Sequence, residues 1–182
     1  MEIKGEYQIA TARDKVWLAL NDAEVLKRCI PGCESLEKES DTEFKAKVMA
    51  AIGPVKARFN SSISLQDLNP PESYTIVGDS KSGAAGFGRG TANVKLTEQD
   101  GGTLLSYEAD FKVGGKLAQV GSRLVLGATR KIADEFFGAF STELDPAASK
   151  VQDDTSAETG ARTWILVGAA ALLLLIGWIL LR

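Results

Sequence analysis

The sequence predicts an α+β domain, in which a long helix covers one side of an antiparallel sheet, with a transmembrane helix at the C-terminus. Three observations lead to this fold class. Residues 43–113 mostly alternate apolar and polar side chains, which is the pattern of strands that bury one face. Residues 116–143 repeat apolar side chains at helical spacing, and residues 164–181 contain no charged side chain.

The N-terminal part is predicted to form one strand and two short helices. Residues 2–10 alternate apolar and polar side chains, as a half-buried strand does. The spacing becomes helical in residues 11–22, and Asp22 can cap a second short helix. That helix is expected to end at Pro31 and Gly32, because these residues rarely continue a helix.

The next part is predicted to be an antiparallel meander. Turn residues separate its strands, with Gly53 and Pro54 after the first and Asp100-Gly101-Gly102 before the last. Since each strand has one apolar and one polar face, we expect the sheet to be covered on a single side. The predicted strands are residues 43–52, 55–65, 73–79, 91–97 and 103–113.

A glycine-rich stretch, GDSKSGAAGFGRGT, occupies residues 78–91. Its glycines match neither the dinucleotide-binding pattern nor the phosphate-binding P-loop. We therefore predict a flexible loop between two strands, which could form the mobile rim of a pocket. Glycine at 88 and 90 would also relieve crowding where a strand bends.

One long amphipathic helix at residues 116–143 is predicted to cover the sheet. The residues after it, 145–163, lack periodicity and are rich in Ala, Ser, Thr and acidic side chains, as flexible tethers are. We therefore expect a domain at residues 1–144, a flexible linker at 145–163 and a transmembrane tail anchor at 164–181. The predicted inner face of the long helix consists of Leu117, Val120, Leu124, Ala128, Ile132, Phe136 and either Ala139 or Phe140.

The length and flanks of residues 164–181 support the membrane prediction. A helix of this length reaches about 27 Å, close to the thickness of the hydrocarbon core of a bilayer. Trp164 and Trp178 lie near its two ends, where indole rings prefer the headgroup region. The N-terminal residues contain no apolar secretory signal. The expected location is the cytoplasmic membrane, with a single-pass chain whose globular domain faces the cytoplasm.

The composition argues against several classes of function. The sequence contains no histidine, which is the commonest general base and metal ligand. Cys29 and Cys33 alone cannot complete a structural zinc site, so we interpret them as small packed thiols. The pair Glu108 and Asp110 falls on the polar face of its strand. We therefore expect no catalytic residue, no metal site, no covalently bound cofactor and, with no block of basic residues, no nucleic-acid partner.

The apolar faces of the sheet and the long helix form the candidate ligand site. Several inward positions, including Ala50, Ala57 and Ala109, carry small side chains that either interdigitate into a filled core or leave a cavity. Leucine at Ala50 or Ala109 would separate these alternatives, because it would impair function only if a cavity exists. The candidate ligand-binding residues are Val48, Ala50, Ile52, Phe59, Tyr107, Phe111, Leu117, Val120, Leu124 and Phe136.

Four segments carry a resemblance to a known family. They are VWLALND at 16–22, VLKRCIPGCESLE at 25–37, GFGRGTANVKL at 86–96 and GGKLAQVGSRL at 114–124. Together they resemble the family of the carbon monoxide dehydrogenase G subunit, a branch of the START-like helix-grip superfamily, over residues 1–144. The resemblance implies a helix-grip (START-like) fold, in which a curved antiparallel sheet wraps around a long C-terminal helix.

The resemblance also implies an accessory role instead of catalysis. It implies recruitment of a molybdenum-containing carbon monoxide dehydrogenase, or a related hydroxylase, to the cytoplasmic membrane. It further implies that the cavity binds a membrane lipid or a respiratory quinone and so couples the enzyme to the respiratory chain. Two alternatives stay open: a membrane recruiter with a filled core that acts only through its surface, and a small enzyme such as a cyclase or hydrolase, which the absence of histidine disfavours.

Overall fold

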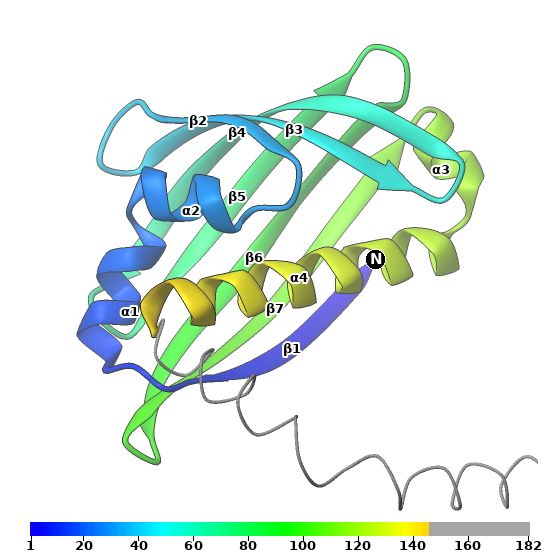
Figure 1. Ribbon diagram of the computed structural model, residues 1–182. Coiled ribbons are helices and arrows are strands. Elements are labelled where there is room, and N and C mark those ends of the chain that lie inside the picture. Colours follow the sequence, from blue (N-terminus) through cyan, green and yellow to red (C-terminus); the bar gives the residue numbers. More distant parts are fainter. Residues whose placement is uncertain (146–182) are drawn as a thin grey trace, which may run out of the picture. The chain divides into compact units, whose positions relative to one another are not determined.

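The computed structural model describes residues 1–145 (Figure 1). Within this part of the chain, seven strands and four helices form an α+β domain. The strands are β1 (Glu2–Ile9), β2 (Cys33–Lys38), β3 (Glu43–Ile52), β4 (Val55–Asn69), β5 (Ser73–Ser82), β6 (Gly86–Gln99) and β7 (Gly102–Gly114). The helices are α1 (Arg13–Leu20), α2 (Ala23–Cys29), α3 (Lys116–Val120) and α4 (Ser122–Leu144).

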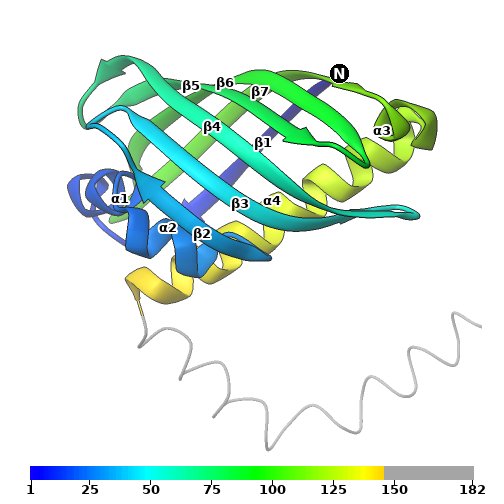
Figure 2. The same cartoon turned by 90° about the horizontal axis from the view of Figure 1, so that it is seen from above.

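The seven strands form one antiparallel sheet in the order β1-β7-β6-β5-β4-β3-β2. Strands β3 to β7 are joined by consecutive hairpins, and β1 pairs with β7 at one edge of the sheet. Seen from above, the sheet arches over α4, which runs diagonally beneath its strands (Figure 2). The helix therefore covers one face of the sheet only.

Alternation of side chains decides which face of each strand turns toward the helices. In β3, Phe44 and Ala46 are buried, while Lys45 and Lys47 between and beside them are exposed. The β3–β4 hairpin turns at Gly53, whose φ of 57° suits glycine better than other residues. This hairpin agrees with the sequence prediction, because its pattern and its turn are both local.

Helices α1 and α2 close one end of the arch, and α3 lies at the other end (Figure 1). Trp17 of α1 packs edge-to-face against Tyr74 of β5, with ring centroids 5.3 Å apart. Asp22 caps α2 by accepting hydrogen bonds from the backbone N–H groups of Glu24 and Val25. The closed end is therefore a packed and capped structure.

The apolar interior has two parts. The larger cluster fills the α1–α2 end and includes Phe140 of α4, which is fully buried. A smaller cluster near α3 is built around Phe59, Ala85 and Leu117. The apolar side chains of the interior thus gather near the two ends of the sheet.

The predicted long helix is broken in two. Gly121, with φ of 93°, separates α3 from α4 and has the backbone conformation that only glycine adopts readily. The break rotates the start of α4 relative to the predicted face. As a result Val125 is buried, while Leu124, which the continuous spacing placed inside, is 53% exposed.

The predicted strands need two corrections. Residues 33–38 form an additional strand, β2, which the sequence prediction omitted. The glycine-rich stretch was predicted to be a flexible loop, but Gly86, Gly88 and Gly90 belong to β6, and the β5–β6 turn is confined to residues 83–85. Glycines that suggest a loop to local reasoning are here held in a strand by the ladders that β6 forms on both sides.

The predicted fold class is wrong in one respect, because it adds a transmembrane helix to the α+β domain. Across residues 1–145, no helix combines the length and the apolar character needed to cross a bilayer. The longest of them, α4, carries Arg130, Lys131, Asp134 and Glu135 in its middle, and a bilayer interior disfavours such charges. Residues 164–181, where that helix was predicted, and most of the predicted linker at 145–163 lie outside the described residues.

Candidate functional site

An apolar cavity of about 330 Å³ lies between the sheet and the helices. Leu20 of α1 and Leu26 of α2 form its closed end, and Phe136 and Phe137 of α4 form its floor. The inner faces of β2 to β7 supply the remaining walls. A cavity of this size falls at the lower end of the range for small-molecule sites.

Only two residues in the cavity wall carry polar side-chain atoms, Tyr74 of β5 and Tyr107 of β7. Burial raises the pKa of both phenols, so each hydroxyl keeps its proton at neutral pH and can donate a hydrogen bond. The wall can therefore hold an apolar molecule and donate to an acceptor atom on it.

Tyr107 belongs to an aromatic group at the edge of the cavity. Its ring stacks with that of Phe137 at a centroid distance of 6.1 Å, and Tyr7 stacks on the same ring at 4.0 Å. The Tyr7 hydroxyl donates a hydrogen bond of 2.6 Å to Asp134 of α4. These contacts join β1 and β7 to α4 and hold the aromatic edge in place.

A second hollow of about 270 Å³ adjoins the cavity along the sheet and shares Ile76 and Ala92 with it. Its wall includes Gly78 of β5 and Gly88 and Gly90 of β6. These glycines lie at alternate positions from Ile76 and Ala92 and therefore on the same inner face of the sheet. Because glycine has no side chain, Gly78 and Gly88 leave space here, whereas Phe111 of β7 already occupies the space beside Gly90. The hollow extends the apolar surface toward the α3 end of β6.

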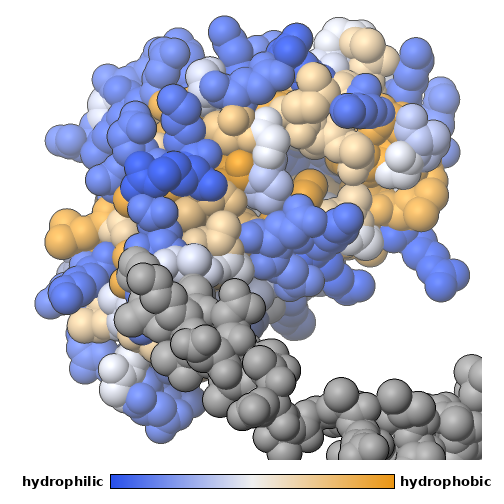
Figure 3. Space-filling model, viewed as in Figure 1, coloured by the Kyte–Doolittle hydropathy of each residue, from blue (hydrophilic) through white to orange (hydrophobic). Residues whose placement is uncertain are grey.

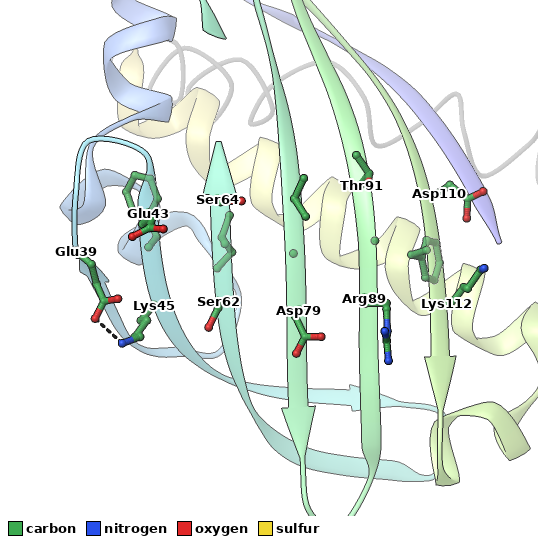
Figure 4. Close-up of a pocket in the computed structure, with 16 residues that line it drawn as sticks. Glu39, Glu43, Lys45, Ser62, Ser64, Asp79, Arg89, Thr91, Asp110 and Lys112 are labelled. Carbon is green, nitrogen blue, oxygen red and sulfur yellow. Dashed lines mark ion pairs between the residues drawn. The ribbon is translucent and has the colours of Figure 1, made fainter. Parts of the chain in front are cut away.

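The opposite face of the sheet carries a larger groove of about 700 Å³, but its chemistry is different (Figure 4). Successive strands place Lys45, Ser62, Asp79, Arg89 and Lys112 side by side across it. The row itself carries three basic side chains and one acidic one, and Glu39, Glu43 and Asp110 add negative charge around it. An ion pair of 2.6 Å joins Glu39 to Lys45. We interpret this groove as a solvated sheet face, because its mixed charges select no single kind of ligand.

The two cysteines show no sign of reactivity. Both thiols are free, and burial raises the pKa of each above its ordinary value. A raised pKa disfavours the thiolate, which is the nucleophile and metal ligand. Among residues 1–145 there is also no cluster of three side chains suited to a metal ion.

The candidate residues from the sequence fall into separate groups. Tyr107 and Phe136 line the cavity, Phe111 borders the second hollow, and Val48 packs against the larger cluster. Their role in ligand binding stays a prediction. The remaining candidates lie toward the α3 end, with Ala50, Ile52, Phe59 and Leu117 in or against the smaller cluster and Val120 and Leu124 beside the β3–β4 turn.

The α3 end also carries exposed apolar surface (Figure 3). Apolar side chains gather there over α3 and the β3–β4 hairpin, where Leu124 and Pro54 are exposed. The side of the same view nearer α2 is mostly covered by polar side chains. The predicted ligand residues Val120 and Leu124 therefore belong to the rim of the molecule instead of the cavity wall.

Sequence reasoning missed several residues of the wall. Tyr74 and Ile76 alternate along β5, so parity alone could have placed them on the inner face. Nothing in the local pattern could have brought Leu20 and Leu26 to the cavity, because their positions depend on how α1 and α2 dock against distant strands.

Comparisons with known proteins now bear on this site. The family model for the carbon monoxide dehydrogenase G subunit (CoxG) matches residues 5–145. No curated protein matches the chain at a significant level.

Solved structures share the fold. A conserved protein from Geobacillus kaustophilus is 29% identical, with a TM-score of 0.76, and the match covers 81% of this chain and 97% of that one. Protein Ms6760 from Mycobacterium smegmatis is 13% identical with a TM-score of 0.61, covering 79% of this chain and 90% of that one. The Zhui aromatase/cyclase from Streptomyces sp. R1128 is 14% identical with a TM-score of 0.61, and the match covers 80% of this chain and 93% of that one. The last two likenesses show the fold alone.

Proposed function

Because this chain belongs to the family of the carbon monoxide dehydrogenase G subunit, we propose that it serves a molybdenum-containing carbon monoxide dehydrogenase, or a related hydroxylase, by binding a respiratory quinone in its apolar cavity. The family name identifies a subunit that accompanies this enzyme. Quinone binding and the identity of the partner are the parts that we propose.

The observation that carries this proposal is the chemistry of the cavity wall. A quinone is an apolar ring with two carbonyl oxygens, and these oxygens accept hydrogen bonds. The wall is apolar except at Tyr74 and Tyr107, which are donors at neutral pH. A site of this kind favours an apolar ring and fixes its orientation through few polar contacts.

We propose an accessory role instead of catalysis. The chain has no histidine, and the cavity wall contains no carboxylate, amine or thiol that could act as base or nucleophile. The electrons therefore come from the partner's own cofactors. The bound quinone takes two electrons from those cofactors and two protons from solvent water, and leaves as the quinol.

The test is mass spectrometry of lipid extracts from the full-length chain, purified in detergent from a bacterium that makes quinones. A quinone at near-stoichiometric level is expected, and added quinone should exchange with it. Protein that is empty and takes up no added quinone would favour the surface-only recruiter, and turnover of a small substrate by the isolated protein would favour an enzyme.

The partner and the location need separate tests. Co-purification of the tagged chain with the carbon monoxide dehydrogenase of its host would support the partner, and its absence under mild detergent would contradict it. We also predict that the protein acts at the cytoplasmic membrane, because respiratory quinones dissolve in lipid. Cell fractionation with immunoblotting tests it, and recovery of the chain only in the soluble fraction would contradict it.

A further inference from the structure

The Tyr74 hydroxyl is a buried donor without a partner. Tyr74 is 5% exposed, and its hydroxyl makes no hydrogen bond within the described residues. The hydroxyl oxygen is nevertheless not fully enclosed. Within residues 1–145, Arg13 Nε is the only fully enclosed side-chain nitrogen or oxygen atom that lacks a hydrogen bond. The hydroxyl therefore reaches open space, although the residue as a whole is buried.

On the inner side of the sheet, the open space that Tyr74 borders is the cavity. Tyr74 also borders a groove on the outer face of the sheet, but its ring packs edge-to-face against Trp17 of α1, which lies on the inner side. Its strand neighbour in the sheet, Val94, is buried and lines the same cavity. A donor that is held by packing and lacks a protein partner can bond a ligand without first breaking another bond.

The volume of the cavity limits what it can hold. At about 330 Å³ the cavity lies near the lower limit of small-molecule sites, which range from about 300 to 1,000 Å³. This is enough for an aromatic head group and too little for a long isoprenoid tail as well. A ligand with a long tail must therefore extend beyond the cavity.

The glycine-lined hollow has room for the tail of such a ligand. A Cβ atom placed on Gly78 would meet no atom within 4 Å, and one on Gly88 would only touch Val113 and Lys112 at van der Waals distance. The hollow is continuous with the cavity through Ile76 and Ala92. Phe111 occupies the space at Gly90, so the path of the tail runs from Gly78 of β5 to Gly88 of β6. Gly88 lies two residues from Gly86, next to the Ala85 carbonyl that accepts a hydrogen bond from Leu117 of α3.

From these observations we infer that the cavity binds its ligand in one orientation. A hydrogen-bond-accepting head lies at the Tyr74 hydroxyl near α1, and an apolar tail follows Gly78 and Gly88 to the α3 end. This assignment rests on the proposed function and defines the ligand class, which is a carbonyl-bearing ring with a linear apolar tail.

The head is tested with Tyr74→Phe in the full-length chain. The probes are 2-methyl-1,4-naphthoquinone, the same ring with an isoprenoid tail, and 2-methylnaphthalene, each titrated calorimetrically in one detergent. Loss of one hydrogen bond should weaken both quinones by about tenfold and leave 2-methylnaphthalene unchanged. The matched control is Thr75→Val on the same strand, which loses a hydroxyl that bonds Asn93 on the outer face and does not line the cavity.

The tail is tested with Gly78→Leu, which places a side chain in the hollow. It should weaken the tailed quinone by at least tenfold and leave the tail-free quinone unchanged. The control is Gly83→Leu in the exposed β5–β6 turn, where an added Cβ also meets no atom within 4 Å. Thermal unfolding of every variant confirms that it is folded, and Tyr74→Phe should keep the wild-type midpoint because its hydroxyl bonds no protein atom.

The outcomes separate the two levels of the proposal. If the wild-type chain binds neither quinone, the proposed function fails together with the orientation. If it binds both and Tyr74→Phe has no effect, or if Tyr107→Phe causes the loss instead, the head is not at Tyr74. If Gly78→Leu weakens both quinones equally, or neither, the tail does not follow the glycines.

Discussion

Ala92→Leu gives the sharpest test of whether the interior is empty. Ala92 is half-buried on β6 and borders both the cavity and the glycine-lined hollow. Leucine adds three carbon atoms at this point. A cavity would accept them, whereas a filled core would not, so the two cases predict opposite changes in the free energy of unfolding.

The magnitudes follow from the cavity volume. Three groups of roughly 30 Å³ occupy about 90 Å³, which is about a quarter of the 330 Å³ available. Burying them contributes at most about 2.4 kcal/mol at 0.8 kcal/mol per group, and ordering the leucine side chain costs about 0.5–1 kcal/mol. The net expectation is a gain of about 1–2 kcal/mol, whereas overpacking a filled core typically costs about 1–3 kcal/mol.

Urea denaturation measures the stability, and titration with the tailed naphthoquinone measures the binding. We expect Ala92→Leu to be more stable than wild type and at least tenfold weaker in quinone affinity. The matched control is Ala46→Leu on β3, since Ala46 is 5% exposed and does not line the cavity. It should lose stability.

Two results would refute this reasoning. Loss of stability in Ala92→Leu, comparable to that of Ala46→Leu, would mean that the interior has no room at this position. A gain in stability with unchanged quinone affinity would mean that the cavity exists but the ligand binds elsewhere.

Three further predictions concern the scaffold. Phe140→Ala should cost about 3–5 kcal/mol in urea denaturation, because Phe140 is fully buried and stacks on Phe136; Phe140→Leu should cost much less. Asp22→Ala should cost about 1 kcal/mol by removing the cap of α2, whereas Asp22→Asn should keep most of the stability. Hydrogen bonds from Arg58 hold the pKa of Glu34 below its ordinary 4.5, so the stability from this pair is present above pH 4.5 and is lost as the pH falls through the lowered value. The stability difference between wild type and Glu34→Gln should therefore disappear in acid, and a difference that persisted at pH 2 would contradict the assignment.

Much of the sheet could be predicted because its signals are local. In β3 and β4 the alternation of side chains identifies the buried face, and Gly53 marks the turn between them. The order of the later strands followed from consecutive hairpins. The prediction failed for β2, whose six residues are too few to show a clear period, and for the β6 glycines, which sheet pairing overrides.

The candidate site was less predictable. Extrapolating one helical spacing from Leu117 through Leu124 put Leu124 inside, because a single glycine gave no signal that the helix breaks at 121. Tyr107 and Phe136 were found because they lie on regular elements with a clear inner face. Tyr74 shares that regularity in β5, but its value as a ligand donor depends on the empty space beside it.

Composition and local pattern are enough to predict which chemical groups this chain offers and which face each long strand buries. The absence of histidine is a matter of composition, the family resemblance is carried by short segments, and strand periodicity follows from side chains that alternate at every residue. The position of the empty space, in contrast, follows from how distant elements pack together. Whether a small residue such as Ala92 packs against a neighbour or borders a cavity depends on the distance between elements far apart in the chain, and docking of α1, α2 and α4 against the sheet sets that distance.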